Sequence, residues 1–156
     1  MNTITSNKSL ISNIVGKSTN NFVYILYTSI IGSILLAVSS KIQIPLTPVP
    51  VTLQTLVLLV MSMFLGWRSA LGATTLYLFQ GAIGLPVFAH GAGLVYLFGP
   101  TGGYLLGFIL ASVIVGFLAE KGWDRSVVLT FISLTIGTVT IYFFGVLWLA
   151  YLKDLN

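Results

Sequence analysis

The side chains that could do chemistry in this chain are neutral polar groups, and they gather in two stretches rich in proline and glycine. One stretch covers residues 43–55 and the other covers residues 80–104. Amides, hydroxyls and phenols on an otherwise apolar background are the usual composition of a small-molecule pocket. The residues concerned are Gln43, Thr47, Thr52, Gln54, Thr55, Gln80, His90, Tyr96, Thr101 and Tyr104.

These stretches lack the combinations of residues that support catalysis or metal binding. The chain has no cysteine, and its one histidine, His90, has no aspartate or glutamate near it in the sequence. A metal site needs several such ligands together, so we expect no metal and no cofactor, and His90 either bonds a ligand or caps a loop. No carboxylate lies within the apolar stretches, which argues against a proton relay, an ion-coupled antiporter or a membrane enzyme. The alternative to a pocket is that both stretches are ordinary surface loops.

Charge is scarce in the chain as a whole. Only 6% of its 156 residues are charged and 56% are hydrophobic, with a mean hydropathy of +1.02, whereas soluble domains are about 25% charged. Too few polar groups remain to cover a soluble surface, so the composition predicts an integral membrane protein surrounded by the lipid bilayer. The net charge of +4 is too scattered to form a nucleic-acid-binding face, and we expect no nucleic-acid partner.

The charged residues divide the chain into apolar runs of membrane-spanning length. The charge-free runs cover residues 18–40, 42–67, 69–119 and 126–152. A spanning helix needs about 20 apolar residues, so three runs fit one span each, and the run at 69–119 fits two spans separated by the glycine-rich residues 81–103. We predict an all-α polytopic bundle of about five transmembrane helices with outward-facing loops broken by glycine and proline. The predicted helices cover residues 22–39, 51–65, 69–85, 101–119 and 127–151.

The positive charges predict the orientation of this bundle. One side of it carries five of them and the other side carries Lys41 and Lys153. By the positive-inside rule the richer side is cytoplasmic, so the N-terminus is expected inside and every proline falls in an outward-facing connection. The first 21 residues lack a signal-peptide cleavage pattern, so the first span is expected to be retained. The five charges on the cytoplasmic side are Lys8, Lys17, Arg68, Lys121 and Arg125.

Several motifs follow one another along the predicted spans and loops. They are PLTPVPVTLQTL at 45–56, GAIGLPVFAHGAG at 81–93, GPTGGYLLGF at 99–108 and GVLWLA at 145–150. In order and spacing these motifs resemble the BioY family, the biotin-specific S components of energy-coupling-factor (ECF) vitamin transporters, over about residues 22–150. The resemblance implies a multi-pass protein that takes up biotin across the bacterial cytoplasmic membrane.

The same resemblance implies the partners. Biotin is the substrate, and a transmembrane T subunit with ATPase subunits supplies energy where these are present; without them the chain would form a homo-oligomer. The chain has no Walker A lysine, so ATP hydrolysis has to come from such partners. The substrate-binding residues expected within the two polar stretches are Thr52, Gln54, Gln80, His90, Thr101 and Tyr104.

The sequence departs from the family at its end. The family normally has a sixth helix, which opens with an acidic residue and a nearby lysine that help to bind biotin. Here YLKDLN follows the fifth predicted span, and Lys153 and Asp154 do not match that pair. We therefore divide the chain into a polar segment at 1–21, a membrane domain at 22–152 and a short tail at 153–156. The alternative function is a truncated, non-transporting remnant that binds no ligand.

Two stripes of small residues at four-residue spacing predict close helix packing. The stripe on the first predicted helix is expected to be a partner interface, because the family docks its T subunit there, and packing within the bundle is an equal alternative. For the second stripe we expect internal packing. The first stripe is Ser29, Ser33 and Ala37, and the second is Gly99, Gly103, Gly107 and Ala111.

Overall fold

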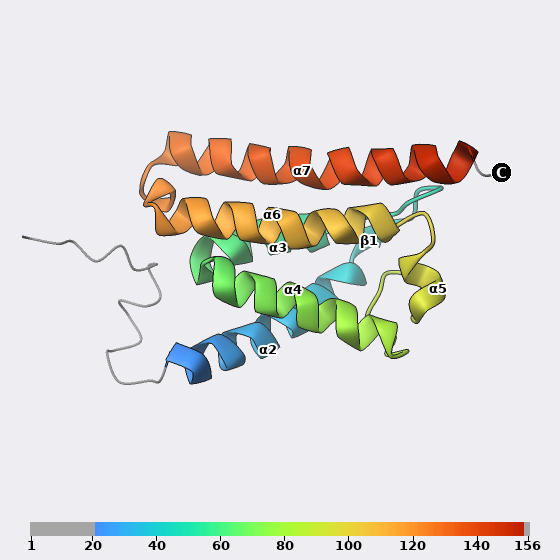
Figure 1. Ribbon diagram of the computed structural model, residues 1–156, viewed down its shortest axis with the longest axis horizontal. Coiled ribbons are helices and arrows are strands. Elements are labelled where there is room, and N and C mark those ends of the chain that lie inside the picture. Colours follow the sequence, from blue (N-terminus) through green and yellow to red (C-terminus); the bar gives the residue numbers. More distant parts are fainter. Residues whose placement is uncertain (1–20, 155–156) are drawn as a thin grey trace, which may run out of the picture.

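The computed structural model describes residues 21–154, which form a bundle of long helices with the irregular backbone gathered at one end (Figure 1). The predicted all-α helical bundle is confirmed, and most of the polar N-terminal segment lies outside the described residues. In chain order the elements are α2 (Asn21–Ser40), β1 (Gln43–Ile44), β2 (Val51–Thr52), α3 (Gln54–Leu65), α4 (Trp67–Ala82), α5 (Leu94–Leu97), α6 (Gly102–Glu120), the 3-10 helix η1 (Trp123–Arg125) and α7 (Val127–Asp154).

Three of the five long helices in the described part of the chain are long and apolar enough to cross a membrane by themselves. They are α2 from Phe22 onward, α6 and α7. The other two are shorter: α3 has 12 residues and α4 has 16, which gives lengths of about 18 and 24 Å at about 1.5 Å per residue. Both fall short of the hydrocarbon core of about 30 Å, so by helix length and composition the described residues supply three of the five predicted spans.

Several helix boundaries in the structure differ from the predicted ones. The span predicted at 51–65 begins only at Gln54, because residues 51–52 pair with residues 43–44 in a short antiparallel hairpin, with Gln43 opposite Thr52. The prolines between the two strands have no backbone N–H to donate. The pairing of the strands supplies hydrogen bonds for the backbone groups next to them. The span predicted at 69–85 is displaced to Trp67–Ala82, and α7 continues to Asp154, so Lys153 and Asp154 form its last turn.

Helix α6 lies between α7 on one side and α3 and α4 on the other (Figure 1). Its glycines set how closely the neighbours approach. A Cβ atom added at Gly103 would lie 2.6 Å from the carbonyl oxygen of Phe144, and one at Gly107 would lie 2.8 Å from the Cα atom of Ile141. Any side chain at these positions would therefore push α7 away. The expected internal packing of the second small-residue stripe is confirmed at Gly103, Gly107 and Ala111, which are buried.

The small-residue stripe on α2 faces α4. Ser29 and Ser33 are buried, and the Ser29 hydroxyl donates to the backbone carbonyl of Ser69 at 3.3 Å. A Cβ atom at Gly72 would collide with the Ser29 hydroxyl. For Ser29 and Ser33 this arrangement favours packing within the bundle, which is the alternative to a partner interface. Ala37, the third residue of the stripe, is only half-buried.

The outer surface of α7 is apolar and exposed. Phe131, Val139, Phe143 and Val146 are each more than half exposed. A soluble protein rarely exposes an apolar surface of this extent, whereas lipid tails surround such a surface at no cost. The exposed side chains therefore agree with the membrane assignment made from composition.

We expect Gly107→Ala to destabilise the bundle. The added methyl group meets the α7 backbone at Ile141 rather than a movable side chain, and overpacking of this kind costs about 1–3 kcal/mol. The thermal unfolding midpoint in detergent should fall by several degrees. Leu106→Val on the exposed face of the same helix is the control and should leave the midpoint almost unchanged; equal midpoints for both variants would contradict the close α6–α7 contact.

Candidate binding cavity

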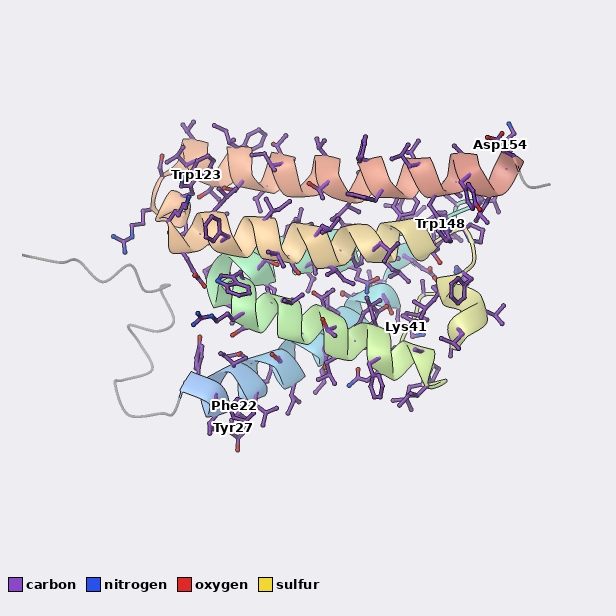
Figure 2. All side chains as sticks on the ribbon, in the orientation of Figure 1. Phe22, Tyr27, Lys41, Trp123, Trp148 and Asp154 are labelled. Atoms are coloured by element: carbon purple, nitrogen blue, oxygen red, sulfur yellow. The ribbon has the colours of Figure 1, made fainter. Side chains whose placement is uncertain are left out.

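The two predicted polar stretches come together at one end of the bundle. The hairpin at 43–52 and the segment around α5 lie beside the C-terminal end of α7 (Figure 1). Lys41, Trp148 and Asp154 mark this end in Figure 2, and Trp123 marks the opposite end. All five prolines are therefore at one end, as the predicted topology requires.

Hydrogen bonds hold the loop at 83–93 against the helices. The Ser40 hydroxyl donates to the Val87 carbonyl at 2.7 Å, the Tyr77 hydroxyl donates to the same carbonyl at 3.3 Å, and the Lys41 ammonium donates to the Phe88 carbonyl. The Phe88 ring is fully buried over Gly81, where a Cβ atom would overlap the ring. The loop thus folds back into the bundle, as its apolar sequence predicts.

The two loops also contact each other. The amide nitrogen of Gln43 lies 3.1 Å from Nε2 of His90, at an exposed position. His90 therefore links the hairpin to the loop at 83–93, which agrees with the loop-capping role proposed as its alternative.

A cavity of about 100 Å³ lies beneath these loops. The hairpin contributes Thr52, α3 contributes Gln54, α4 contributes Tyr77, and α6 with its preceding turn contributes Tyr104 and Thr101. The Thr101 hydroxyl donates to the Tyr96 carbonyl at 3.4 Å, which ties the start of α6 to α5. Parts of the chain that are far apart in sequence therefore form the cavity wall.

Among the described residues of this wall, Gln54 is the one with a buried side-chain atom that has no hydrogen-bond partner. Its side chain is 4% exposed, and its amide nitrogen has no hydrogen-bond partner among the described residues. Leaving a buried donor unpaired costs about 1–3 kcal/mol. A ligand that offers an acceptor to this nitrogen would remove that cost.

Aromatic rings form much of the remaining wall. Tyr96 and Tyr77 line the cavity, and both rings pack on Phe88, which does not line it: Tyr96 stacks on Phe88 with ring centroids 4.7 Å apart, and Tyr77 meets Phe88 edge-to-face at 5.5 Å. On the other side Tyr104 meets Tyr142 edge-to-face at 5.9 Å. Gly145 makes this position possible, because a Cβ atom there would lie 2.4 Å from the Tyr104 ring. Flat apolar rings with phenol groups suit a small ring system with a few polar atoms.

The structure places four of the six predicted site residues on the cavity wall. Thr52, Gln54, Thr101 and Tyr104 line it, whereas Gln80 and His90 do not. Sequence reasoning missed Tyr77 and Tyr142, which line the cavity from the interiors of α4 and α7. Each is an aromatic residue in an apolar helix, and nothing in its sequence context distinguishes it from a lipid-facing aromatic residue.

The cavity wall carries no charged side chain. Between residues 21 and 154 there is also no group of three histidine, cysteine or carboxylate residues that could hold a metal ion. The described site can thus form hydrogen bonds and apolar contacts with a neutral group.

We expect Ser40→Ala to loosen the loop at 83–93. The change removes the hydrogen bond to Val87, and such a bond contributes about 0.5–1.5 kcal/mol. Backbone amides of the loop should exchange with deuterated water up to about tenfold faster. Ser39→Ala is the matched control, since the Ser39 hydroxyl bonds only within its own helix, to Leu36; a similar effect of both variants would argue against the loop anchor.

Comparison with known proteins identifies the family. Residues 11–156 match the BioY family. The chain is 35% identical over 138 residues to biotin transporter BioY2 of Lactococcus lactis, covering 88% of this chain and 75% of that protein. It is 48% identical over 88 residues to biotin transporter BioY of Thermotoga maritima, covering 56% of this chain and 52% of that protein.

The fold is similar to a solved one. A crystal structure of the S component for biotin from an ECF-type ABC transporter superposes with a TM-score of 0.70 at 22% identity, over 90% of this chain and 79% of that one. The likeness shows that the helical bundle described above is the fold of that S component. Since the family match extends over nearly all of the sequence, the chain belongs to the BioY family.

Proposed function

We propose that this protein is the biotin-binding S component of a vitamin transporter and takes up biotin across the cytoplasmic membrane. The observation that supports this most is the unpaired amide nitrogen of Gln54 in an uncharged, aromatic-walled cavity. The named relatives are biotin transporters, and the protein acts as a transporter component rather than as an enzyme.

The chemistry of biotin suits this wall. Its ureido group has one carbonyl acceptor and two N–H donors, and its sulfur-containing ring is apolar. We propose that the Gln54 amide nitrogen donates to the ureido carbonyl and that the hydroxyls of Thr52 and Tyr104 accept from the N–H groups, since all three residues line the cavity. An analogue that lacks a matching group would leave a buried protein group unpaired, which is how such a site discriminates.

The absence of charge in the wall predicts which end of biotin enters. A carboxylate buried without a partner is very costly, so the ureido ring should point inward and the carboxylate should stay where the cavity opens. Lys41, which is exposed and bonded to the loop at Phe88, supplies a positive charge at this end of the bundle.

The cavity has to widen to admit the ligand. Its volume of about 100 Å³ is below the range of about 300–1,000 Å³ that is typical of ligand pockets. The hairpin and the loop at 83–93 form its non-helical side, and the contacts between them include the exposed pair of Gln43 and His90. We propose that these two segments separate to admit biotin and close over it.

The charge distribution supports an orientation in the membrane. Within residues 21–154, Arg68 lies in the first turn of α4, and Lys121 and Arg125 lie between α6 and α7, at one end of the bundle (Figure 1). Lys41 follows α2 and Lys153 lies in the last turn of α7, at the other end. The positive-inside rule makes the first end cytoplasmic, so the N-terminus is inside and the cavity faces outward. A transmembrane T subunit with ATPase subunits would then drive release into the cell, as suits a protein whose fold is that of an ECF S component.

Titration calorimetry with biotin tests the function and the site together. The folded protein should bind biotin, and Gln54→Leu should weaken binding by about 5- to 150-fold, because the buried ureido carbonyl would be left without a donor, which costs about 1–3 kcal/mol. Gln80→Leu is the matched control, since Gln80 does not line the cavity. This variant should bind biotin with unchanged affinity. No binding by the folded protein would favour the remnant alternative, and equal losses in both variants would contradict the site.

Biotin analogues test the direction of binding. Biotin methyl ester removes the charge that we place at the cavity opening, so its affinity should stay close to that of biotin. Diaminobiotin lacks the ureido carbonyl and carries amines that protonate at neutral pH, so it should lose more affinity than Gln54→Leu does, because a charge would enter the uncharged cavity. Competition against labelled biotin measures both analogues; a large loss with the ester and none with the diamine would reverse the orientation.

A further inference from the structure

A second hollow lies on the outer surface of α2 and α4. It is an open groove of about 670 Å³, bordered by Ile25 of α2 and by residues of α4. We call it the α2–α4 groove, and its lining residues on α4 are Trp67, Arg68, Leu71, Gly72, Thr75, Leu76 and Phe79. None of these residues lines the cavity described above.

The groove is as long as one leaflet of a membrane. Arg68 and Phe79 are 11 residues apart on α4, which corresponds to about 16 Å along the helix axis. One leaflet of a hydrocarbon core of about 30 Å has a depth of about 15 Å. A groove that begins at the membrane surface near Arg68 therefore ends near the middle of the bilayer.

The interior of the groove suits a hydrocarbon chain. Its sides are mostly apolar, formed by Ile25, Leu71, Leu76 and Phe79, with the small Gly72 and the hydroxyl-bearing Thr75 among them. The ring of Phe79 is 60% exposed at the deep end. These side chains offer contact area and no charge, so a polar occupant such as a peptide backbone would gain few hydrogen bonds there.

The other end of the groove carries a positive charge. The Arg68 side chain is exposed and lies over the Trp67 ring at 5.3 Å. Among residues 21–154 no ion pair joins Arg68 to a carboxylate, and Glu120, at the same end of the bundle, lies against Gly66. A guanidinium can bond two phosphate oxygens at once, and tryptophan is favoured at the level of lipid headgroups.

We propose that the α2–α4 groove binds one anionic phospholipid. Its phosphate lies on Arg68 beside Trp67, and one of its acyl chains fills the groove toward Phe79. The length of the groove, its apolar lining and its single cationic end all match this occupant. The attraction of one juxtamembrane arginine to anionic lipid contributes about 1 kcal/mol to the free energy of binding. The protein should therefore bind an anionic lipid about fivefold more tightly than a zwitterionic lipid at this site.

Trp67 can report on the lipid directly. Trp123→Phe and Trp148→Phe leave it as the single tryptophan of the chain, and circular dichroism checks that this variant is folded. The variant is reconstituted into phosphatidylcholine vesicles with increasing fractions of brominated phosphatidylglycerol, and the quenching of Trp67 is compared with that by brominated phosphatidylcholine. We expect about fivefold tighter binding of phosphatidylglycerol.

Two charge variants in the Trp67-only protein separate a specific site from a general surface effect. Arg68→Gln should reduce the ratio of phosphatidylglycerol to phosphatidylcholine affinity to about one. Arg125→Gln removes an exposed charge at the same end of the bundle but outside the groove, and this variant should keep the ratio of the parent protein. Equal losses in both variants would mean diffuse attraction to the surface and would overturn the proposal. Weak quenching by either lipid would also overturn it, since a protein partner or a second copy of the chain would then cover the groove.

Discussion

Close backbone contact along α6 is the interaction on which the rest of the structure depends. Gly103 and Gly107 let α7 approach on one side, and Gly116 lies so close to Trp67 that a Cβ atom there would be 2.4 Å from its backbone nitrogen. In lipid, helices gain no hydrophobic driving force from association, and close packing takes its place. The position of α6 between α7, α3 and α4 in turn brings Thr101 and Tyr104 to the binding cavity.

A second constraint explains why the cavity lies at one end. Irregular backbone at membrane depth is stable only where protein or a cavity surrounds it. The prolines and glycines of the hairpin and of the loop at 83–93 therefore gather at one end, where Ser40, Lys41 and Tyr77 bond the loop carbonyls. These hydrogen bonds pair the carbonyls of the loop. The amide nitrogen of Gln54, buried in the cavity wall, has no such partner among the described residues.

The helices could be predicted from the sequence because apolar runs between sparse charges have the length of a membrane span. The hairpin could not, since residues 51–52 belong to the same charge-free run as the helix that follows them, and only their pairing with residues 43–44 separates the two. The cavity was partly predictable: Thr52, Gln54, Thr101 and Tyr104 follow from polar residues beside proline and glycine. Gln80 satisfies the same criterion but does not line the cavity, and Tyr77 lines it without satisfying the criterion, because the rotation of α4 is set by its packing partners.

The central claim is that biotin binds with its ring in the cavity beneath the two loops. A crystal structure with a biotin analogue in which selenium replaces the ring sulfur tests it most directly, since anomalous scattering locates the selenium atom. We predict one anomalous peak within the cavity between Gln54, Tyr96 and Tyr104, with the hairpin and the loop at 83–93 displaced outward. A peak elsewhere on the protein, with this cavity empty and unchanged, would contradict the account.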